Sequence, residues 1–93
     1  MESPKRRRMI VSGVVQGVGF RKFIDRTAKE LKLCGWVRNL NDGTVEINAQ
    51  GPGKELDELI RQAIQGPARS SVRSVLTEEK NPDLSLGNFA IIA

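Results

Sequence analysis

The chain has 93 residues, a length suited to a single domain with one modest hydrophobic core. Apolar residues make up 39% of it and charged residues 28%, which is typical of a globular protein and excludes a disordered chain. The net charge of +4 suits an anionic partner, but part of the excess lies in the four basic residues 5–8. We therefore expect residues 1–7 to be a solvated basic tail and residues 8–93 the domain; attraction of an anionic substrate or a nucleic acid is the alternative role of this run.

Cys34 is the only cysteine, which excludes an internal disulfide, and we expect it to be a small core or strand-edge residue. The chain has no histidine, so the usual zinc clusters are absent. No apolar run approaches the roughly 20 residues that span a bilayer, and residues 1–8 are polar, unlike a signal peptide. We expect a cytoplasmic protein that binds neither membrane nor metal.

In chain order, residues 9–15 are rich in Ile and Val and predict a strand that stops at a loop with two glycines, residues 16–19. From Phe20 to Leu31 the apolar spacing changes to three or four residues, which predicts an amphipathic helix ending near Gly35.

Residues 36–38 predict a short second strand, and Asp42-Gly43 is typical of a hairpin turn. Apolar and polar side chains alternate over residues 45–50, the pattern of a half-exposed strand. The spacing over residues 56–64 predicts a second helix that is closed by Gly66-Pro67. Residues 72–79 predict a fourth strand, and the apolar end 89–92 is suited to adding to the sheet.

This order of elements matches an α+β fold, the ferredoxin-like split βαβ sandwich (βαββαβ), with both helices on one face of an antiparallel sheet. In that topology the first two strands run parallel with the third between them, about two spacings of 4.8 Å apart. Their ends therefore share one edge of the sheet. We expect this to bring residues 16–20 within side-chain reach of Asn39.

The glycine loop lies between a strand and a helix N-terminus, where free N–H groups and the helix dipole favour an anion. It has neither the ending of a Walker loop nor the third glycine of a dinucleotide fingerprint. A tight connection without a ligand is the alternative interpretation. The candidate phosphate cradle consists of the backbone of Gln16, Gly17, Val18, Gly19 and Phe20.

Arg21 follows this loop, in the first helical turn, where a cation opposes the helix dipole by about 0.3 to 1 kcal/mol. A bound anion would reverse that sign, and a guanidinium matches two phosphate oxygens at once. A purely solvent-exposed arginine is the competing interpretation. Asn39 ends the second strand, where an asparagine often has a purely local role in the turn. Its alternative role is to hold a water, since its side chain is both donor and acceptor and need not ionise.

Without histidine, no side chain has an unperturbed pKa near neutrality, so a conventional general base is missing unless the pKa of a carboxylate or lysine is strongly shifted. An acyl phosphate does not need a general acid for its leaving group, because a carboxylate with a pKa of about 4 to 5 departs unprotonated. Positioning water and offsetting charge are then the main tasks, and a phosphate oxygen can take the proton of the water.

Three segments carry a resemblance: Val-Ser-Gly-Val-Val-Gln-Gly-Val-Gly-Phe-Arg at 11–21, Gly-Trp-Val-Arg-Asn at 35–39 and Asp-Gly-Thr-Val-Glu at 42–46. In order and spacing they resemble the signature of the acylphosphatase family, and the likeness extends over about residues 8–80. The chain departs from the family pattern at its end, where it finishes on Ala93 rather than an aromatic residue.

The resemblance implies that Arg21 and the loop amides bind phosphate, that Asn39 orients the attacking water, and that Trp36 and Arg38 are structural. It also implies hydrolysis of an acyl phosphate to a carboxylate and inorganic phosphate, with no metal or cofactor, and we expect a monomer. Two alternatives remain. A nucleic-acid-binding domain of the same fold would need aromatic residues on its central strands, and residues 9–15 and 45–50 have none. A domain of a larger carbamoyl-transferring enzyme fits the short chain less well.

Overall fold

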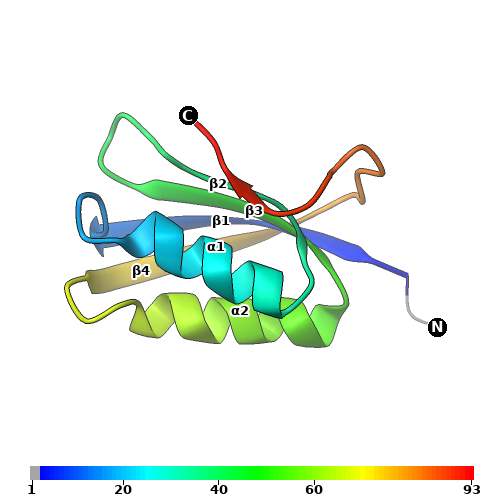
Figure 1. Ribbon diagram of the computed structural model, residues 1–93, viewed down its shortest axis with the longest axis horizontal. Helices are drawn as coiled ribbons and strands as arrows, with labels where there is room; N and C mark the ends of the chain where they lie inside the picture. Colours follow the sequence, from blue (N-terminus) through cyan, green and yellow to red (C-terminus); the bar gives the residue numbers. More distant parts are fainter. Residues whose placement is uncertain (1–2) are drawn as a thin grey trace.

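The computed structural model describes residues 3–93, and its helices and strands follow the predicted order with one short strand added (Figure 1). Both helices pack on the same face of one sheet, which confirms the ferredoxin-like α+β fold. No helix of these residues is long and apolar enough to cross a bilayer. The elements are β1 (Lys5–Val14), α1 (Phe20–Glu30), β2 (Cys34–Asn39), β3 (Val45–Gly51), α2 (Gly53–Gln65), β4 (Ser71–Lys80) and β5 (Ala90–Ile91).

The strand order is β4-β1-β3-β2-β5. β3 is antiparallel to both β1 and β2, so these two run parallel with β3 between them, as the sequence predicted. β5 pairs in parallel with β2, through Trp36–Ala90 and Val37–Ile91, which makes the sheet mixed rather than wholly antiparallel. The C-terminal ends of β1 and β2 therefore lie at one edge of the sheet, where the predicted site residues follow them.

β1 begins at Lys5, four residues earlier than the Met9 start that the sequence suggested, so residues 5–7 of the predicted basic tail belong to the sheet. Residues 1–2 of that tail lie outside the described residues. Arg6 and Arg7 pair with β3 on one side and β4 on the other. The Arg7 guanidinium donates to Glu79 Oε1 of β4 and Asp57 Oδ1 of α2, each at 2.5 Å. The side chain is only 13% exposed and ties three elements together, which the sequence pattern of a charge run does not reveal.

β3 was predicted to be half exposed, but both of its faces are buried. One face carries Val45, Ile47 and Ala49 into the core, and the polar face is covered by long side chains of the flanking strands. There Glu46, only 4% exposed, accepts hydrogen bonds from Arg8 and Arg38 at 2.5 and 2.7 Å. The alternating pattern therefore belongs to the central strand of the sheet, and arginine side chains cover the face of this strand that carries its polar residues.

α1 ends at Glu30 rather than near Gly35. Lys32 adopts a left-handed backbone (φ 59°), and two closing hydrogen bonds run from Lys32 N to Lys29 O and from Leu33 N to Ala28 O. These are the two bonds of a Schellman motif, with lysine at the position that glycine usually fills. Leu33 then turns into the core, so the motif redirects the chain into β2.

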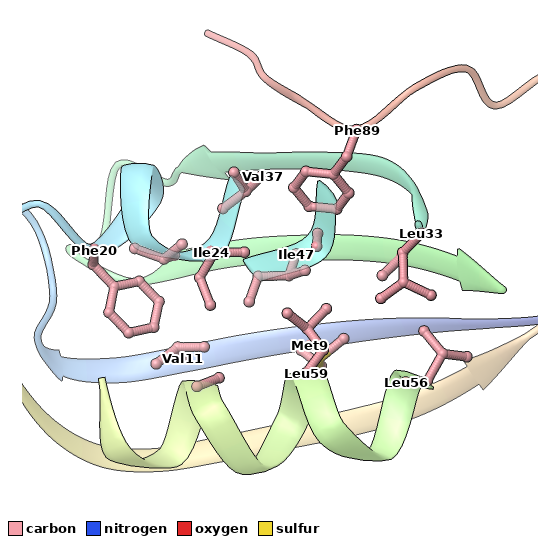
Figure 2. Packing of buried hydrophobic residues seen from close by; sticks show 14 of the residues in the cluster. Met9, Val11, Phe20, Ile24, Leu33, Val37, Ile47, Leu56, Leu59 and Phe89 are labelled. Atoms are coloured by element: carbon pink, nitrogen blue, oxygen red, sulfur yellow. The ribbon is translucent and has the colours of Figure 1, made fainter. Parts of the chain in front are cut away.

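The core lies between the sheet and the helices (Figure 2). α1 contributes Phe20, Ile24 and Ala28 at helical spacing, and α2 contributes Leu56, Leu59 and Ala63. Phe89, which is 2% exposed, inserts into this cluster just before β5 and fixes the C-terminal segment on the sheet. The cluster consists of Met9, Val11, Val15, Phe20, Ile24, Ala28, Leu33, Val37, Val45, Ile47, Ala49, Leu56, Leu59, Ala63 and Phe89.

Candidate active site

The loop between β1 and α1 is anchored at both ends by apolar side chains. Val15 and Phe20 are each 1% exposed. Between them Gly17 (φ 74°) and Gly19 (φ 81°) adopt left-handed backbone, which residues with a Cβ disfavour by about 1 to 2 kcal/mol. A Cβ placed on either glycine would meet no heavy atom within 4 Å, so the glycines serve the backbone path rather than close packing.

Gly19 is the N-cap of α1, and no side chain caps this helix end. The first-turn amides therefore have no intrahelical acceptor, and the first turn contains no acidic residue to offset the dipole. Arg21, a cation, occupies that turn and is half buried. Within residues 3–93 it makes no ion pair shorter than 4.0 Å. Loop amides and guanidinium together provide donors without an acceptor, which is the composition of an anion site.

A hollow of about 400 Å³ opens at this loop. Among the described residues its lining contains no carboxylate and two cations, Arg21 and Lys22. Ile91 of β5 forms part of the wall, which places the C-terminal segment beside the loop. The lining residues are Val15, Gly17, Gly19, Phe20, Arg21, Lys22 and Ile91.

Gln16 connects the loop to the β2–β3 hairpin. Its side-chain Nε2 donates to Leu40 O at 2.8 Å and to Thr44 O at 2.9 Å, so one amide group holds both sides of the turn. The sequence predicted only a backbone contribution from Gln16; the structure adds a side-chain contact that fixes the loop relative to the end of β2. The sequence carries no local signal for this contact, because the partners of Gln16 lie more than 20 positions away in the chain.

The hairpin is itself fixed by a local network. The Asp42 carboxylate accepts from the Thr44 hydroxyl at 2.6 Å and from the Thr44 N–H at 3.0 Å. These hydrogen bonds, that from the hydroxyl first, lower the pKa of Asp42 below its usual value. Leu40 N also donates to Thr44 O, the same carbonyl that Gln16 contacts. The position of Thr44 is thus determined from both sides.

Asn39 is the last residue of β2 and pairs with Val45 of β3, directly before the hairpin. Its side-chain Oδ1 is buried, yet within the described chain it has no hydrogen-bond partner. Nearly all buried polar atoms in proteins are paired, so this acceptor is available for a hydrogen bond from a water or a ligand; Asp25 Oδ1 of α1 is unpaired in the same way. Asn39 itself lies outside the lining of the hollow at Arg21, and the two are connected through Gln16 and the hairpin.

The structure therefore places Gly17, Gly19, Phe20 and Arg21 together around one hollow, while Val18 lines an adjacent one. Lys22 and Ile91 were not expected there. Ile91 reaches the hollow only because β5 pairs with β2, a long-range contact that the short apolar end of the sequence indicated in outline.

The family model of acylphosphatase matches residues 7–91 of this chain. The chain belongs to the acylphosphatase family. An acylphosphatase of Chlorobaculum tepidum is 54% identical over 88 residues, which cover 95% of this chain and 96% of the relative. Among solved structures, the acylphosphatase of Bacillus subtilis superposes with a TM-score of 0.92 at 38% identity, over 96% of this chain and 99% of that one.

A second solved structure, full-length HypF in its phosphate- and nucleotide-bound form, matches all of this chain but only 12% of its own length. The identity is 26% and the TM-score 0.86, so the acylphosphatase fold also occurs inside a much longer protein. The acylphosphatases of Chlorobaculum tepidum and Bacillus subtilis match end to end instead.

Proposed function

We propose that this chain hydrolyses acyl phosphates, with Arg21 and the loop amides binding the phosphoryl group and Asn39 orienting the attacking water. Family membership supports the reaction, and the orphaned Asn39 Oδ1 is the observation that best supports the assignment of residues. A buried acceptor without a protein partner is suited to receive a hydrogen bond from water.

The phosphoryl group would lie in the hollow at Arg21. Amides of residues 17–20 and the positive end of the α1 dipole would face its oxygens there, and the guanidinium adds a two-pronged contact. Since the amides and Arg21 have no anionic partner within the described residues, their donors are available to the phosphoryl oxygens. They would stabilise the charge that spreads over those oxygens in the transition state.

The proposed reaction is an in-line displacement. The water oxygen held by Asn39 attacks phosphorus while the bond from phosphorus to the bridging acyl oxygen breaks, and its electron pair leaves with the carboxylate. A nonbridging phosphoryl oxygen takes the proton of the water. No side chain changes its protonation state, which agrees with a hollow whose described lining holds no carboxylate and a chain that has no histidine.

The test is hydrolysis of benzoyl phosphate by the purified protein and two variants. Arg21→Ala should lower kcat/KM by at least about 100-fold and weaken competitive inhibition by inorganic phosphate, because it removes a charged contact to the phosphoryl group. Asn39→Ala should lower kcat by a similar factor and change phosphate inhibition less than about threefold, because the water is held only during turnover.

Matched controls are Arg73→Ala, an exposed arginine on β4, and Asn41→Ala, an exposed asparagine in the same hairpin as Asn39. Both controls should keep kcat within about twofold of the parent protein. Equal activity of Arg21→Ala and Asn39→Ala with these controls would refute the assignment of the two residues.

We also propose that the protein acts as a monomer. Light scattering across the concentration range of the assay should give the mass of one chain, and activity per molecule should not depend on concentration.

A further inference from the structure

A second hollow, of about 390 Å³, lies directly beside the candidate phosphate cradle, residues 16–20, which is called the phosphate loop from here on. It shares Gly19 and Lys22 with the hollow at Arg21, so the two hollows adjoin at these residues. Its other walls come from α1 and from the connection between α2 and β4. The lining residues are Val18, Gly19, Lys22, Phe23, Arg26, Pro67, Ala68 and Arg69.

Three cations and no carboxylate line this second hollow among the described residues. Lys22 and Arg26 are one helical turn apart, and like charges at this spacing destabilise a helix. Arg69 adds a third positive charge from a different element. Within residues 3–93 none of the three makes an ion pair shorter than 4.0 Å. The sum is a local excess of positive charge, which an anion would neutralise.

Acidic residues do lie on the far side of Arg26, where Glu30 and Glu58 line a separate hollow with it. Glu58 is already engaged, since its two carboxylate oxygens accept hydrogen bonds from Arg61 and Gln62. Within residues 3–93 no carboxylate, Glu30 included, lies within 4.0 Å of the charged groups of Lys22, Arg26 or Arg69.

The position of this hollow follows from the layout of one end of the molecule (Figure 1). The phosphate loop lies between the β2–β3 hairpin and the connection of α2 to β4. Contacts agree with this view: Gln16 binds the hairpin on one side, and Val18 and Gly19 share the second hollow with Pro67 and Arg69 on the other.

In-line attack places the leaving group on the side of phosphorus opposite the water. If Asn39 holds the water on the hairpin side, the acyl group points toward the α2–β4 connection and hence toward the second hollow. Its volume equals that of roughly a dozen waters, which is ample for a four-carbon acyl group. Apolar surface of Val18, Phe23 and Pro67 is available to the carbon chain, and the cations border it.

We propose that this hollow is the subsite for the acyl group, and that Lys22, Arg26 and Arg69 favour acyl phosphates whose acyl group carries a second negative charge. This inference rests on the proposed function. The favoured class comprises acyl groups that end in a carboxylate or a phosphate; a neutral aliphatic or aromatic acyl group gains only the apolar contacts.

The test compares succinyl phosphate with butyryl phosphate, which have the same number of acyl carbons and differ in the terminal carboxylate. An exposed ion pair changes affinity by about 1.5- to 5-fold, so three cations should give kcat/KM about 5- to 20-fold higher for succinyl phosphate. The double variant Arg26→Gln/Arg69→Gln should reduce this ratio to about 2 or less. Lys22 is left intact because it also borders the phosphate hollow.

The control is Lys54→Gln, which removes one positive charge near the start of α2, at the opposite end of this helix from the α2–β4 connection. It should keep the ratio within about 1.5-fold of the parent protein. Raising the ionic strength should lower the ratio of the parent protein and leave that of the double variant unchanged, because exposed charges are screened.

Two results would overturn the inference, and they differ in meaning. If butyryl phosphate is hydrolysed in an Arg21-dependent manner but the double variant keeps the parent ratio, the subsite is wrong while the function stands. If the parent protein hydrolyses neither compound, the proposed function fails and the inference falls with it. Thermal unfolding of the double variant serves as the folding check, and removing the like-charge pair should not lower its Tm.

Discussion

The side chain of Gln16 makes the contact between the phosphate loop and the hairpin that follows Asn39, so Gln16→Ala tests whether that contact positions the site. The substitution removes two hydrogen bonds, to Leu40 O at 2.8 Å and to Thr44 O at 2.9 Å. Each such bond contributes about 0.5 to 1.5 kcal/mol net, so we expect the free energy of unfolding to fall by about 2 kcal/mol.

The effect on catalysis should exceed what this loss of stability implies. A displacement of about 1 Å between reacting groups can cost about 100-fold in rate. In the proposed site the loop binds the phosphoryl group, and the hairpin directly follows Asn39. We therefore expect kcat for benzoyl phosphate to fall about 10- to 100-fold, with KM changed less than about threefold because the loop amides and Arg21 remain. Gln16→Glu, which has the same shape but places a carboxylate without a donor against two carbonyl oxygens, should lower stability and kcat at least as much as the alanine variant.

Gln50 provides a matched control at the other end of β3. Its Nε2 donates to Asp83 O at 3.0 Å and its Oε1 accepts from Asp83 N at 2.7 Å, so Gln50→Ala also removes two hydrogen bonds between the sheet and a loop. It should lose similar stability in urea titrations and keep kcat within about twofold. If both variants lose stability equally and both keep kcat, Gln16 is structural and the positioning argument is refuted.

Two further predictions concern the sheet. Burial raises the pKa of Glu46, but hydrogen bonds from Arg38 and Arg8 outweigh it and leave the pKa below its ordinary 4.5. The unfolded chain thus binds the proton first, so this stabilisation is complete above pH 4.5 and is lost as the pH falls through the folded-state pKa. Glu46→Gln should lower the free energy of unfolding by about 2 kcal/mol at neutral pH. It should also weaken the fall of this free energy with decreasing pH below 4.5; an unchanged pH dependence would contradict this. Gly35 has a φ of 130°, and a Cβ there would lie against Asn48 O, so Gly35→Ala should lower the free energy of unfolding, measured in urea, by more than about 3 kcal/mol. Gly43→Ala, where a Cβ would meet no neighbouring atom, should lower it by only about 1 kcal/mol.

Local pattern was sufficient for the elements that position the site. Residue composition, the period-2 alternation over residues 45–50 and the helical spacings together predicted both helices and four strands. The order of elements matched one topology, in which residues 16–20 and Asn39 share an edge. The mismatch of Arg21 with the helix dipole is visible in the amino-acid sequence itself, because it depends only on the residue type and its place in the first turn. The catalytic roles of Arg21 and Asn39 stay predictions until the variants are measured.

The errors arose where tertiary contacts outweigh local pattern. The charge along residues 5–8 suggested a solvated segment, yet the Arg7 side chain is only 13% exposed and hydrogen-bonds to partners 50 and 72 positions away. The end of helix α1 has Lys32 where glycine marks most such ends, so the next glycine in the sequence was taken as the boundary. The polar face of β3 was assigned to solvent, because alternation reports side-chain polarity and not the arginines that cover Glu46.

The second hollow is a functional feature that local sequence pattern could not predict either. The sequence alone shows that Lys22 and Arg26 form a like-charge pair on one helix. The simplest interpretation of such a pair is that both side chains are solvated. Arg69 changes that account, but its proximity depends on how α2 packs, which fixes where residues 67–69 return beside the phosphate loop. If the two proposals hold, selectivity for the acyl group depends on the packing of two helices, while recognition of the phosphoryl group depends on one contiguous loop. The loop and the α2–β4 connection can therefore vary independently, and substitutions at Arg69 should change substrate preference without affecting phosphate inhibition.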